Sequence, residues 1–247
     1  MTINYSGKLI LFTTFYEHRA YSPYIQSMVE TTTVLTKLGI KWDYWPSHGS
    51  FHLERAVNDA LTKFKDDPEA TDFLMIDSDE SWDAAGLVRL LLHPEEMVGG
   101  TYRMKNRWER YISFIHQEDG HPIGKKLADG TFLLKTDAIP GGFMRIKKSA
   151  VQKYHDAYPD QRVEERDGER KYTSTVFFES KVIDKLFHSH DVLFCHRLRA
   201  LGIELWIDPL VKVDHWGLTK YEGDYDNIVG FPLGAITEIL KKFSVPI

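Results

Sequence analysis

The residues best suited to chemistry are two aspartates that follow an apolar run. The segment FLMIDSDESWD places Asp77 and Asp79 two positions apart, with Ser78 between them. In an extended backbone this spacing points both carboxylates to one face. If the apolar run is a parallel strand, its carboxyl end is where open α/β sheets bind ligands, and a divalent ion that bridges to phosphate oxygens fits there. The alternative is a turn in which these residues cap the following helix.

Three further segments carry candidate residues. In VDHWG a strand-like run ends at His215, whose imidazole beside carboxylates suits Mn²⁺ or a similar transition ion, although a single histidine is more often an ordinary polar group. Asp191 stands at the start of SHDVLFCHRLRALG, where a carboxylate caps the helix or serves as a general base. In AIPGGFMRI, Gly141 and Gly142 allow close approach of the backbone to a substrate, or form an ordinary turn.

The elements that must position these residues alternate in type over the first half of the chain. Hydrophobic periodicity and turn signals predict strands over 8–13, 40–46 and 72–77, a strand within 96–105 ahead of a basic segment, and helices within 15–39, 52–64 and 83–94. Alternation of this kind indicates parallel strands with helical crossovers. The aspartate pair then lies at the carboxyl end of the third strand.

The second half of the chain predicts a mixed sheet. Short strands at 111–116 and 131–136 are separated by turn signals, which favours antiparallel hairpins, and another strand follows the glycine pair. The charged segment 161–171 is typical of a mobile surface loop. A helix over 189–202, a strand over 204–217 and an amphipathic helix over 231–243 complete the prediction.

Composition bounds the class of protein. The chain has 247 residues, 43% of them hydrophobic, which predicts one domain. A net charge of −5 provides no global basic field, so we expect no nucleic-acid partner. The single cysteine, Cys195, and the absence of a signal peptide favour a cytoplasmic location. No apolar run reaches the ~20 residues of a membrane helix, so we expect a soluble protein without a transmembrane segment.

The order of these segments resembles that of GT-A glycosyltransferases, especially the small family-2-like and the viral or bacterial enzymes with a DxD motif. The resemblance covers most of the chain. It rests on ERAVNDAL, FLMIDSDESW, VGGTYRMK, IPGGFMRI, HDVLFCHRLRALGIELWIDP and VKVDHWG. It implies an α/β GT-A fold with a mixed central sheet in a single domain, 1–247. A Rossmann-like nucleotide-sugar-binding half spans about 1–105, and an acceptor-binding half spans about 106–247.

The resemblance also implies roles for individual residues. It assigns Asp77, Asp79 and His215 to a divalent metal, with Mn²⁺ favoured over Mg²⁺, and Asp191 to the catalytic base. It places Gly141 and Gly142 at the donor sugar or acceptor. The nucleotide-binding residues that it implies are Thr13, Thr14, Tyr16, Arg55, Asn58, Asp77, Ser78 and Lys105.

These roles describe a metal-dependent glycosyltransferase of the hexosyltransferase type. Its donor is a nucleoside diphosphate sugar of the UDP or GDP type, and its acceptor is a hydroxyl group, for example on a glycan. Inversion follows if Asp191 faces the side of the sugar opposite the leaving group. One alternative is a noncatalytic nucleotide- or sugar-binding module. Another is a DxD phosphatase like the haloacid dehalogenases, although their motif lies on the first strand and Asp77 follows the third.

Overall fold

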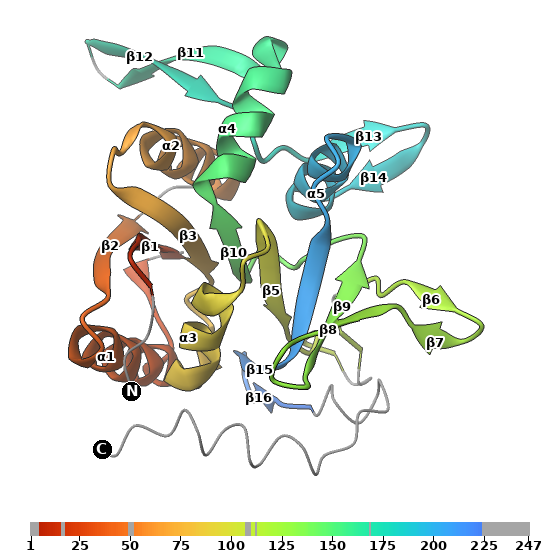
Figure 1. Ribbon diagram of the computed structural model, residues 1–247. Coiled ribbons are helices and arrows are strands. Elements are labelled where there is room, and N and C mark those ends of the chain that lie inside the picture. The colour runs from red at the N-terminus through yellow and green to blue at the C-terminus, as the bar shows by residue number, and fades with distance from the viewer. Residues whose placement is uncertain are drawn as a thin grey trace.

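The computed structural model describes residues 5–15, 18–48, 52–106, 110–111, 113–167 and 169–223 (Figure 1). Its central feature is a large mixed sheet with the strand order β2-β1-β3-β10-β5-β15-β9-β8. These strands are β1 (Lys8–Phe15), β2 (Lys41–His48), β3 (Ala70–Ile76), β5 (Met97–Thr101), β8 (Gly124–Lys126), β9 (Phe132–Thr136), β10 (Phe143–Lys147) and β15 (Leu205–Trp216). The short strands β4 (Glu80–Trp82) and β16 (Lys220–Tyr221) pair with β15 beside this path.

Strand directions follow the predicted change from alternating to hairpin-rich sequence. Strand β1 runs parallel to both β2 and β3, and β15 runs parallel to β5. Strand β10 lies antiparallel between β3 and β5, and β9 lies antiparallel beside β15. The predicted α/β class with a mixed central sheet is therefore confirmed. Strands from both predicted halves, 1–105 and 106–247, join in this one sheet.

Helices cover both faces of the sheet (Figure 1). Helices α1 (Ser22–Lys37) and α3 (Ala84–Leu92) contribute to one buried apolar cluster. Helices α2 (Leu53–Asp66), α4 (Lys148–Ala157) and α5 (His190–Ala200) contribute to the other. Each apolar stripe is thus buried against a sheet face, which holds the strand ends in fixed positions.

The segment 161–171 is a hairpin, so the predicted mobile loop is wrong. Strands β11 (Arg162–Asp167) and β12 (Arg170–Thr175) pair antiparallel over their whole length. Polar contacts attach this hairpin to α2: Arg55 lies 2.9 Å from the Glu165 carboxylate, and the Tyr172 hydroxyl donates to Asp59 over 3.1 Å. The charged side chains therefore serve cross-strand and inter-element pairing, which charge density alone did not reveal.

The predicted strand at 111–116 is also wrong. Among the described residues of that segment only isolated bridges form, from Tyr111 to Arg103 and from Ile115 to Thr136. Tyr111 and Ile115 instead pack against the apolar cluster beneath α2, α4 and α5, so their hydrophobicity reflects packing rather than strand pairing. The hairpins expected nearby are present as β6 (Gln117–Glu118) with β7 (His121–Pro122), and as β8 with β9.

Several elements were not predicted, and one prediction lies outside the described residues. The unpredicted elements are α4, the strand β4, a short 3-10 helix (Pro159–Gln161) and the hairpin of β13 (Lys181–Ile183) with β14 (Leu186–His188). The amphipathic helix expected over 231–243 lies in a part of the chain that the structure does not describe. Among the helices that are described, none has both the length and the apolar character required to span a bilayer.

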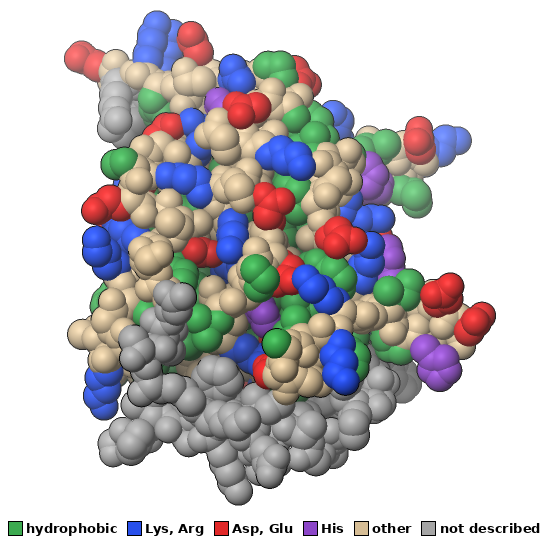
Figure 2. Space-filling model, viewed as in Figure 1, with side chains coloured by type: hydrophobic (Ala, Val, Ile, Leu, Met, Phe, Trp, Pro, Cys, Tyr) green, Lys and Arg blue, Asp and Glu red, His purple; other side chains and the backbone are tan. Residues whose placement is uncertain are grey.

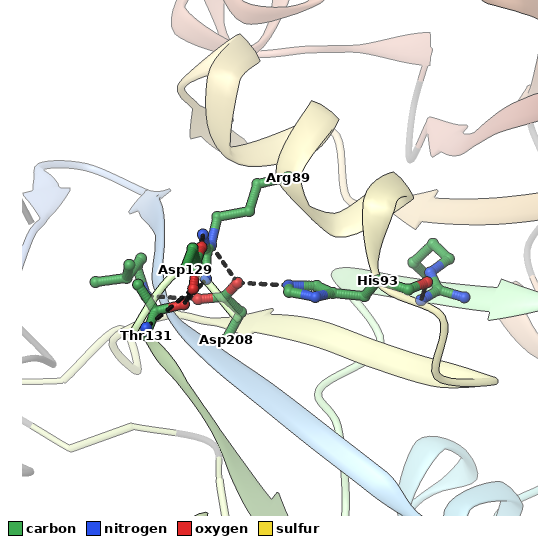
Figure 3. A network of polar contacts seen from close by, with 7 residues as sticks. Arg89, His93, Asp129, Thr131 and Asp208 are labelled. Atoms are coloured by element: carbon green, nitrogen blue, oxygen red, sulfur yellow. Dashed lines mark hydrogen bonds and ion pairs between the residues drawn. The ribbon is translucent and has the colours of Figure 1, made fainter. Parts of the chain in front are cut away.

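A buried polar network fixes β15 against α3 and the loop before β9 (Figure 3). Arg89 Nε donates to Asp208 Oδ2 over 2.5 Å, and His93 Nε2 lies 2.7 Å from the same oxygen. The Arg89 guanidinium also donates to Asp129 over 3.0 Å and to Thr131 over 2.6 Å. Since His215 lies near the end of β15, this network holds the strand that carries one of the predicted metal ligands.

Candidate functional site

Asp77 follows β3 directly, as predicted from the apolar run. Its backbone N–H donates to the Gly142 carbonyl over 3.0 Å, which joins the end of β3 to the glycine pair. The next helix, α3, is capped by Asp83, whose carboxylate accepts from the Ala85 N–H over 2.9 Å. The cap is therefore formed outside the Asp77–Asp79 segment, and the two aspartates do not serve as the N-cap of that helix.

Asp191 lies against the glycine pair. Its Oδ2 accepts from the Gly141 N–H over 3.4 Å, and its Oδ1 accepts from the Ser189 hydroxyl and the Val192 N–H. Ser189 occupies the N-cap position of α5, so Asp191 stands in the first turn, where the helix dipole favours a negative charge. The fold thus brings the predicted base, the glycine pair and the end of β3 together.

Asp79 faces His215 at the edge of the site. The His215 Nε2 lies 3.8 Å from Asp79 Oδ2, and its Nδ1 lies 3.0 Å from the Arg103 carbonyl. Because a carbonyl oxygen only accepts, we assign the proton to Nδ1, which leaves the Nε2 lone pair toward Asp79. The Asp79 carbonyl accepts from the Trp216 N–H over 2.7 Å, which fixes the distance between the two segments.

Lys105 also reaches this place. Its ammonium group forms an ion pair and hydrogen bond with Asp79 Oδ2, the oxygen that faces His215. Gly217 lies against the lysine stem: a Cβ atom there would stand 3.5 Å from Lys105 Cδ. The resemblance placed Lys105 at the nucleotide, and the structure shows it at the DxD motif.

Sequence reasoning missed Glu80 and Tyr102. Glu80 is fully buried, and neither of its carboxylate oxygens has a hydrogen-bond partner among the described residues. The Gly142 N–H donates to the Tyr102 hydroxyl over 3.1 Å. A Cβ atom on Gly142 would lie 2.1 Å from Glu80 Oε1 and 2.6 Å from the Tyr102 hydroxyl, so this position requires glycine. The signal available in the sequence was a third acid immediately after the aspartate pair.

Burial and neighbouring negative charges together shape the electrostatics of this group. Burial, with the nearby charges of Asp79 and Asp191, raises the pKa of Asp77 to about 7, against the opposing effect of Lys105. Burial, with Asp77 and Asp79, raises the pKa of Glu80 well above its ordinary value. A site in which carboxyl groups resist ionisation because they repel one another favours a bound cation.

The donor set for a metal is partial. Across the part of the chain that the structure describes, no group of three or more His, Cys, Asp or Glu side chains is arranged to hold an ion, so Asp77, Asp79 and His215 do not form a preassembled triad. Asp79 and His215 do fit as a pair of ligands. His215 Nδ1 is held by a backbone carbonyl, as is usual for metal-binding histidines. Two protein ligands suffice where substrate phosphates complete the shell, the usual arrangement for hard divalent ions.

The predicted nucleotide residues divide into two groups. Thr13 is buried with its hydroxyl 2.7 Å from that of Tyr24, and Asn58 accepts from and donates to the backbone of Phe177 and Phe178. These two side chains make structural contacts, as does Arg55 of α2, which pairs with Glu165 of the β11–β12 hairpin.

Thr14 and Ser78 lie beside the aspartate pair. The pairing of Phe12 with Met75 brings Thr14, near the end of β1, to the level of the residues that follow β3. The Ser78 carbonyl accepts from the Tyr21 N–H over 3.1 Å. Thr14 and Ser78 therefore lie near the aspartate pair, whereas Tyr16 lies outside the described residues.

A cavity of about 610 Å³ lies elsewhere, between the end of α5 and β9. Its lining includes His116, Lys135, His196 and Arg199 but none of the predicted site residues. Its acidic neighbours balance its cations, because Lys135 pairs with Glu204 over 2.7 Å and Arg199 pairs with Asp137 over 2.5 Å. On the face shown in Figure 2, acidic and basic side chains are likewise interspersed.

The chain is similar to known proteins in fold but not detectably in sequence. No protein-family model and no curated protein sequence matches the chain. Among solved structures, it is similar to A197 from STIV, with a TM-score of 0.49 and 13% identity over 85% of this chain and 86% of that one. It is also similar to the catalytic domain of Drosophila beta1,4galactosyltransferase 7, with a TM-score of 0.46 and 11% identity over 82% and 65%.

A third similar structure is the 4-diphosphocytidyl-2C-methyl-D-erythritol synthase of Anaerococcus prevotii DSM 20548, with a TM-score of 0.33. Its identity is 11% over 66% of this chain and 81% of that one. At such TM-scores and identities these likenesses carry no information about substrate or residue roles.

Proposed function

We propose that this protein is a metal-dependent GT-A glycosyltransferase that moves a sugar from a nucleoside diphosphate sugar to a hydroxyl acceptor. The observation that carries the proposal is the meeting of three segments at the end of β3. Asp77 is bonded to Gly142, Gly141 to Asp191, and Asp79 faces His215 over 3.8 Å. These contacts bring the proposed base Asp191, the buried glycine pair and the proposed cation-binding pair of Asp79 and His215 together at the end of β3.

Asp79 and His215 are the residues proposed to hold the divalent ion, with Asp77 beside them. When bound, such an ion neutralises charge on the departing diphosphate. Mn²⁺ is favoured over Mg²⁺ because the pair includes an imidazole nitrogen. We propose that Thr14, Ser78 and Lys105 contact the nucleotide diphosphate, of the UDP or GDP type.

Asp191 is the proposed catalytic base. Two hydrogen bonds orient its Oδ1, whereas Oδ2 is held by the single, longer bond from Gly141, which leaves it able to take a proton from an acceptor hydroxyl. Base assistance of this kind contributes typically ~10²–10⁴-fold to a rate. We propose inversion, a glycan acceptor at Gly141 and Gly142, and a cytoplasmic location, the last supported by the single buried cysteine.

Thermal unfolding with nucleotides tests this proposal. The wild type is measured with UDP or GDP, each with and without Mn²⁺, beside Asp79→Ala and the control Asp214→Ala. Asp214 is a partly exposed acid adjacent to His215 that pairs with Lys220 over 2.9 Å. At ~100 times its Kd, a ligand stabilises the native state by about 2.7 kcal/mol. We expect one nucleotide to stabilise the wild type and Asp214→Ala when Mn²⁺ is present, and to leave Asp79→Ala unchanged.

The alternatives predict other outcomes. A noncatalytic module would give the same Mn²⁺-dependent stabilisation without sugar transfer or donor hydrolysis across a broad acceptor panel. A phosphatase would hydrolyse a simple phosphomonoester without any nucleotide requirement and would lose that activity in Asp77→Asn. Absence of stabilisation by either nucleotide, with or without metal, would contradict the proposed function.

A further inference from the structure

Lys105 occupies the position where a cation is needed. Its ammonium group contacts Asp79 Oδ2, and the same oxygen lies 3.8 Å from His215 Nε2. The lysine is held there, since its stem lies against Gly217 and its ammonium group lies 5.9 Å from the centre of the Tyr21 ring. The side chain of Lys105 is 31% exposed, so it has room to move away from Asp79.

The Lys105 ammonium group and a divalent ion cannot both contact Asp79 Oδ2 at the same time. A divalent ion held by Asp79 and His215 needs the oxygen and the nitrogen that face each other, and metal–oxygen distances are near 2.0–2.2 Å. An ammonium group in contact with that oxygen lies inside the volume that the ion and its water ligands require. Moreover, bringing a lysine cation and a divalent ion to one carboxylate is opposed by their mutual repulsion.

Lys105 already provides part of the charge that the site lacks. Its positive charge lies near Asp77, Asp79 and Glu80. It partly offsets the repulsion among these acids. In the described structure it is thus an internal substitute for a bound cation, with half the charge of a divalent ion.

We propose that Lys105 is a tethered competitor of the divalent ion: it neutralises Asp79 in the free protein and leaves Asp79 when the ion binds. This inference rests on the proposed function, because it concerns the same Asp79–His215 pair. Its consequence is that the free protein binds the ion weakly, which couples tight metal binding to the arrival of the donor diphosphate.

Titration with Mn²⁺ alone, followed by the paramagnetic resonance signal of the free ion, tests the competition on the full chain. The variants are Lys105→Met, which removes the ammonium group, Lys105→Arg, which keeps a cation, and the control Lys220→Met. Lys220 is also ion-paired beside β15, with Asp214 and Glu222 each at 2.9 Å, so its substitution changes the net charge equally.

We expect Lys105→Met to bind Mn²⁺ about tenfold more tightly than the wild type, and Lys105→Arg and Lys220→Met to stay within about twofold of it. Circular dichroism establishes that each variant is folded. An affinity of Lys105→Met that is equal to or weaker than that of the wild type overturns the proposal, as does a gain of the same size in Lys220→Met. Lack of Mn²⁺ binding by both the wild type and Lys105→Met also overturns it.

The nucleotide experiment separates this inference from the proposed function. If UDP or GDP stabilises the protein with Mn²⁺ but Lys105→Met does not tighten Mn²⁺ binding, only the competition is overturned. If Lys105→Met tightens Mn²⁺ binding but no nucleotide stabilises the protein, the competition stands and the glycosyltransferase function is contradicted.

Discussion

Two groups of buried or partly buried acids in this protein differ in how their charge is balanced. In the network of Figure 3, Asp208 is fully buried, yet its Oδ2 accepts from Arg89 and lies against His93, and its Oδ1 accepts from the Leu210 N–H. At the end of β3, Glu80 is equally buried without such hydrogen bonds, and burial together with the charges of Asp79 and Asp191 raises the pKa of Asp77.

This difference separates structure from function. Buried charges that serve stability are paired and hydrogen-bonded, because an unpaired one is costly. Acids left with too few partners are therefore expected where a ligand supplies the missing charge. Figure 3 shows residues from α3, β15 and the loop before β9 directed at one another, whereas the acids after β3 lie around the buried glycine pair with one lysine beside Asp79.

The largest expected effect is a loss of sugar-transfer rate on substitution of Asp191. Asp191→Asn keeps the size of the side chain but removes the base, so we expect the rate of sugar transfer to fall ~10²–10⁴-fold. Stability should fall by only about 1 kcal/mol, because the single amide oxygen replaces one of the two carboxylate oxygens that accept from Gly141, Ser189 and Val192. Initial rates and thermal unfolding check both parts. A rate within a fewfold of the wild type would remove Asp191 from the mechanism.

Asp208 should show the opposite pattern. Asp208→Ala leaves Arg89 buried without its closest anionic partner, and we expect a loss of about 3–5 kcal/mol in the free energy of unfolding. Asp129→Ala is the matched control, because Asp129 pairs with the same arginine but is 38% exposed, and we expect a smaller loss there. Urea denaturation measures both. Equal losses would show that burial does not distinguish the two acids.

Removing the charge of Asp77 should stabilise the folded protein. Its folded-state pKa of about 7 lies above its ordinary value near 4, so the folded protein loses stability as the pH rises between these values, and the loss is complete above pH 7. Asp77→Asn removes this loss. We expect the variant to be more stable than the wild type by about 1–2 kcal/mol at pH 8, less than the full linkage value because Asp77 is half-buried.

The control for that effect is pH itself. At pH 3.5 Asp77 is protonated in the folded protein and mostly protonated in the unfolded one, so the two proteins should unfold with nearly equal free energies in metal-free buffer. A destabilised Asp77→Asn at pH 8 would show that the carboxylate is favourably paired in the folded protein, which would break the contrast with Asp208.

The smallest effect is expected at Arg55. Its pairing with Glu165 over 2.9 Å is partly exposed, and pairs of this kind contribute about 0.2–1 kcal/mol. Arg55→Ala should therefore lower the stability by no more than about 1 kcal/mol and leave the Mn²⁺-dependent nucleotide affinity unchanged. Loss of that affinity, measured by calorimetry, would return Arg55 to the nucleotide site that the sequence resemblance implied.

Much of the fold could be predicted because its elements carry local signals. The apolar run before Asp77 and the strand that ends near His215 both appear where periodicity predicted them. The β11–β12 hairpin could not be recognised, because its charged residues are explained only by contacts with α2, more than 100 positions away. Tertiary contacts of this kind leave no local pattern.

The sequence indicated which acidic residues belong to the candidate site, but not which residues they contact. Acid spacing at a strand end indicated Asp77 and Asp79, and the start of a helix indicated Asp191; the fold brings all three to one place. Glu80 was missed because its burial comes from the pairing of β4 with β15, and Lys105 was assigned to the nucleotide because its contact with Asp79 joins distant segments. Asn58 likewise found its partners in the backbone of a remote segment.

The measurement that tests the central claim most directly is anomalous diffraction from crystals soaked with Mn²⁺ and the stabilising nucleotide. We predict an anomalous peak within coordinating distance of both Asp79 and His215, with the diphosphate adjoining it. A bound nucleotide with no anomalous peak at Asp79, or a peak held by residues away from Asp79 and His215, would contradict the account.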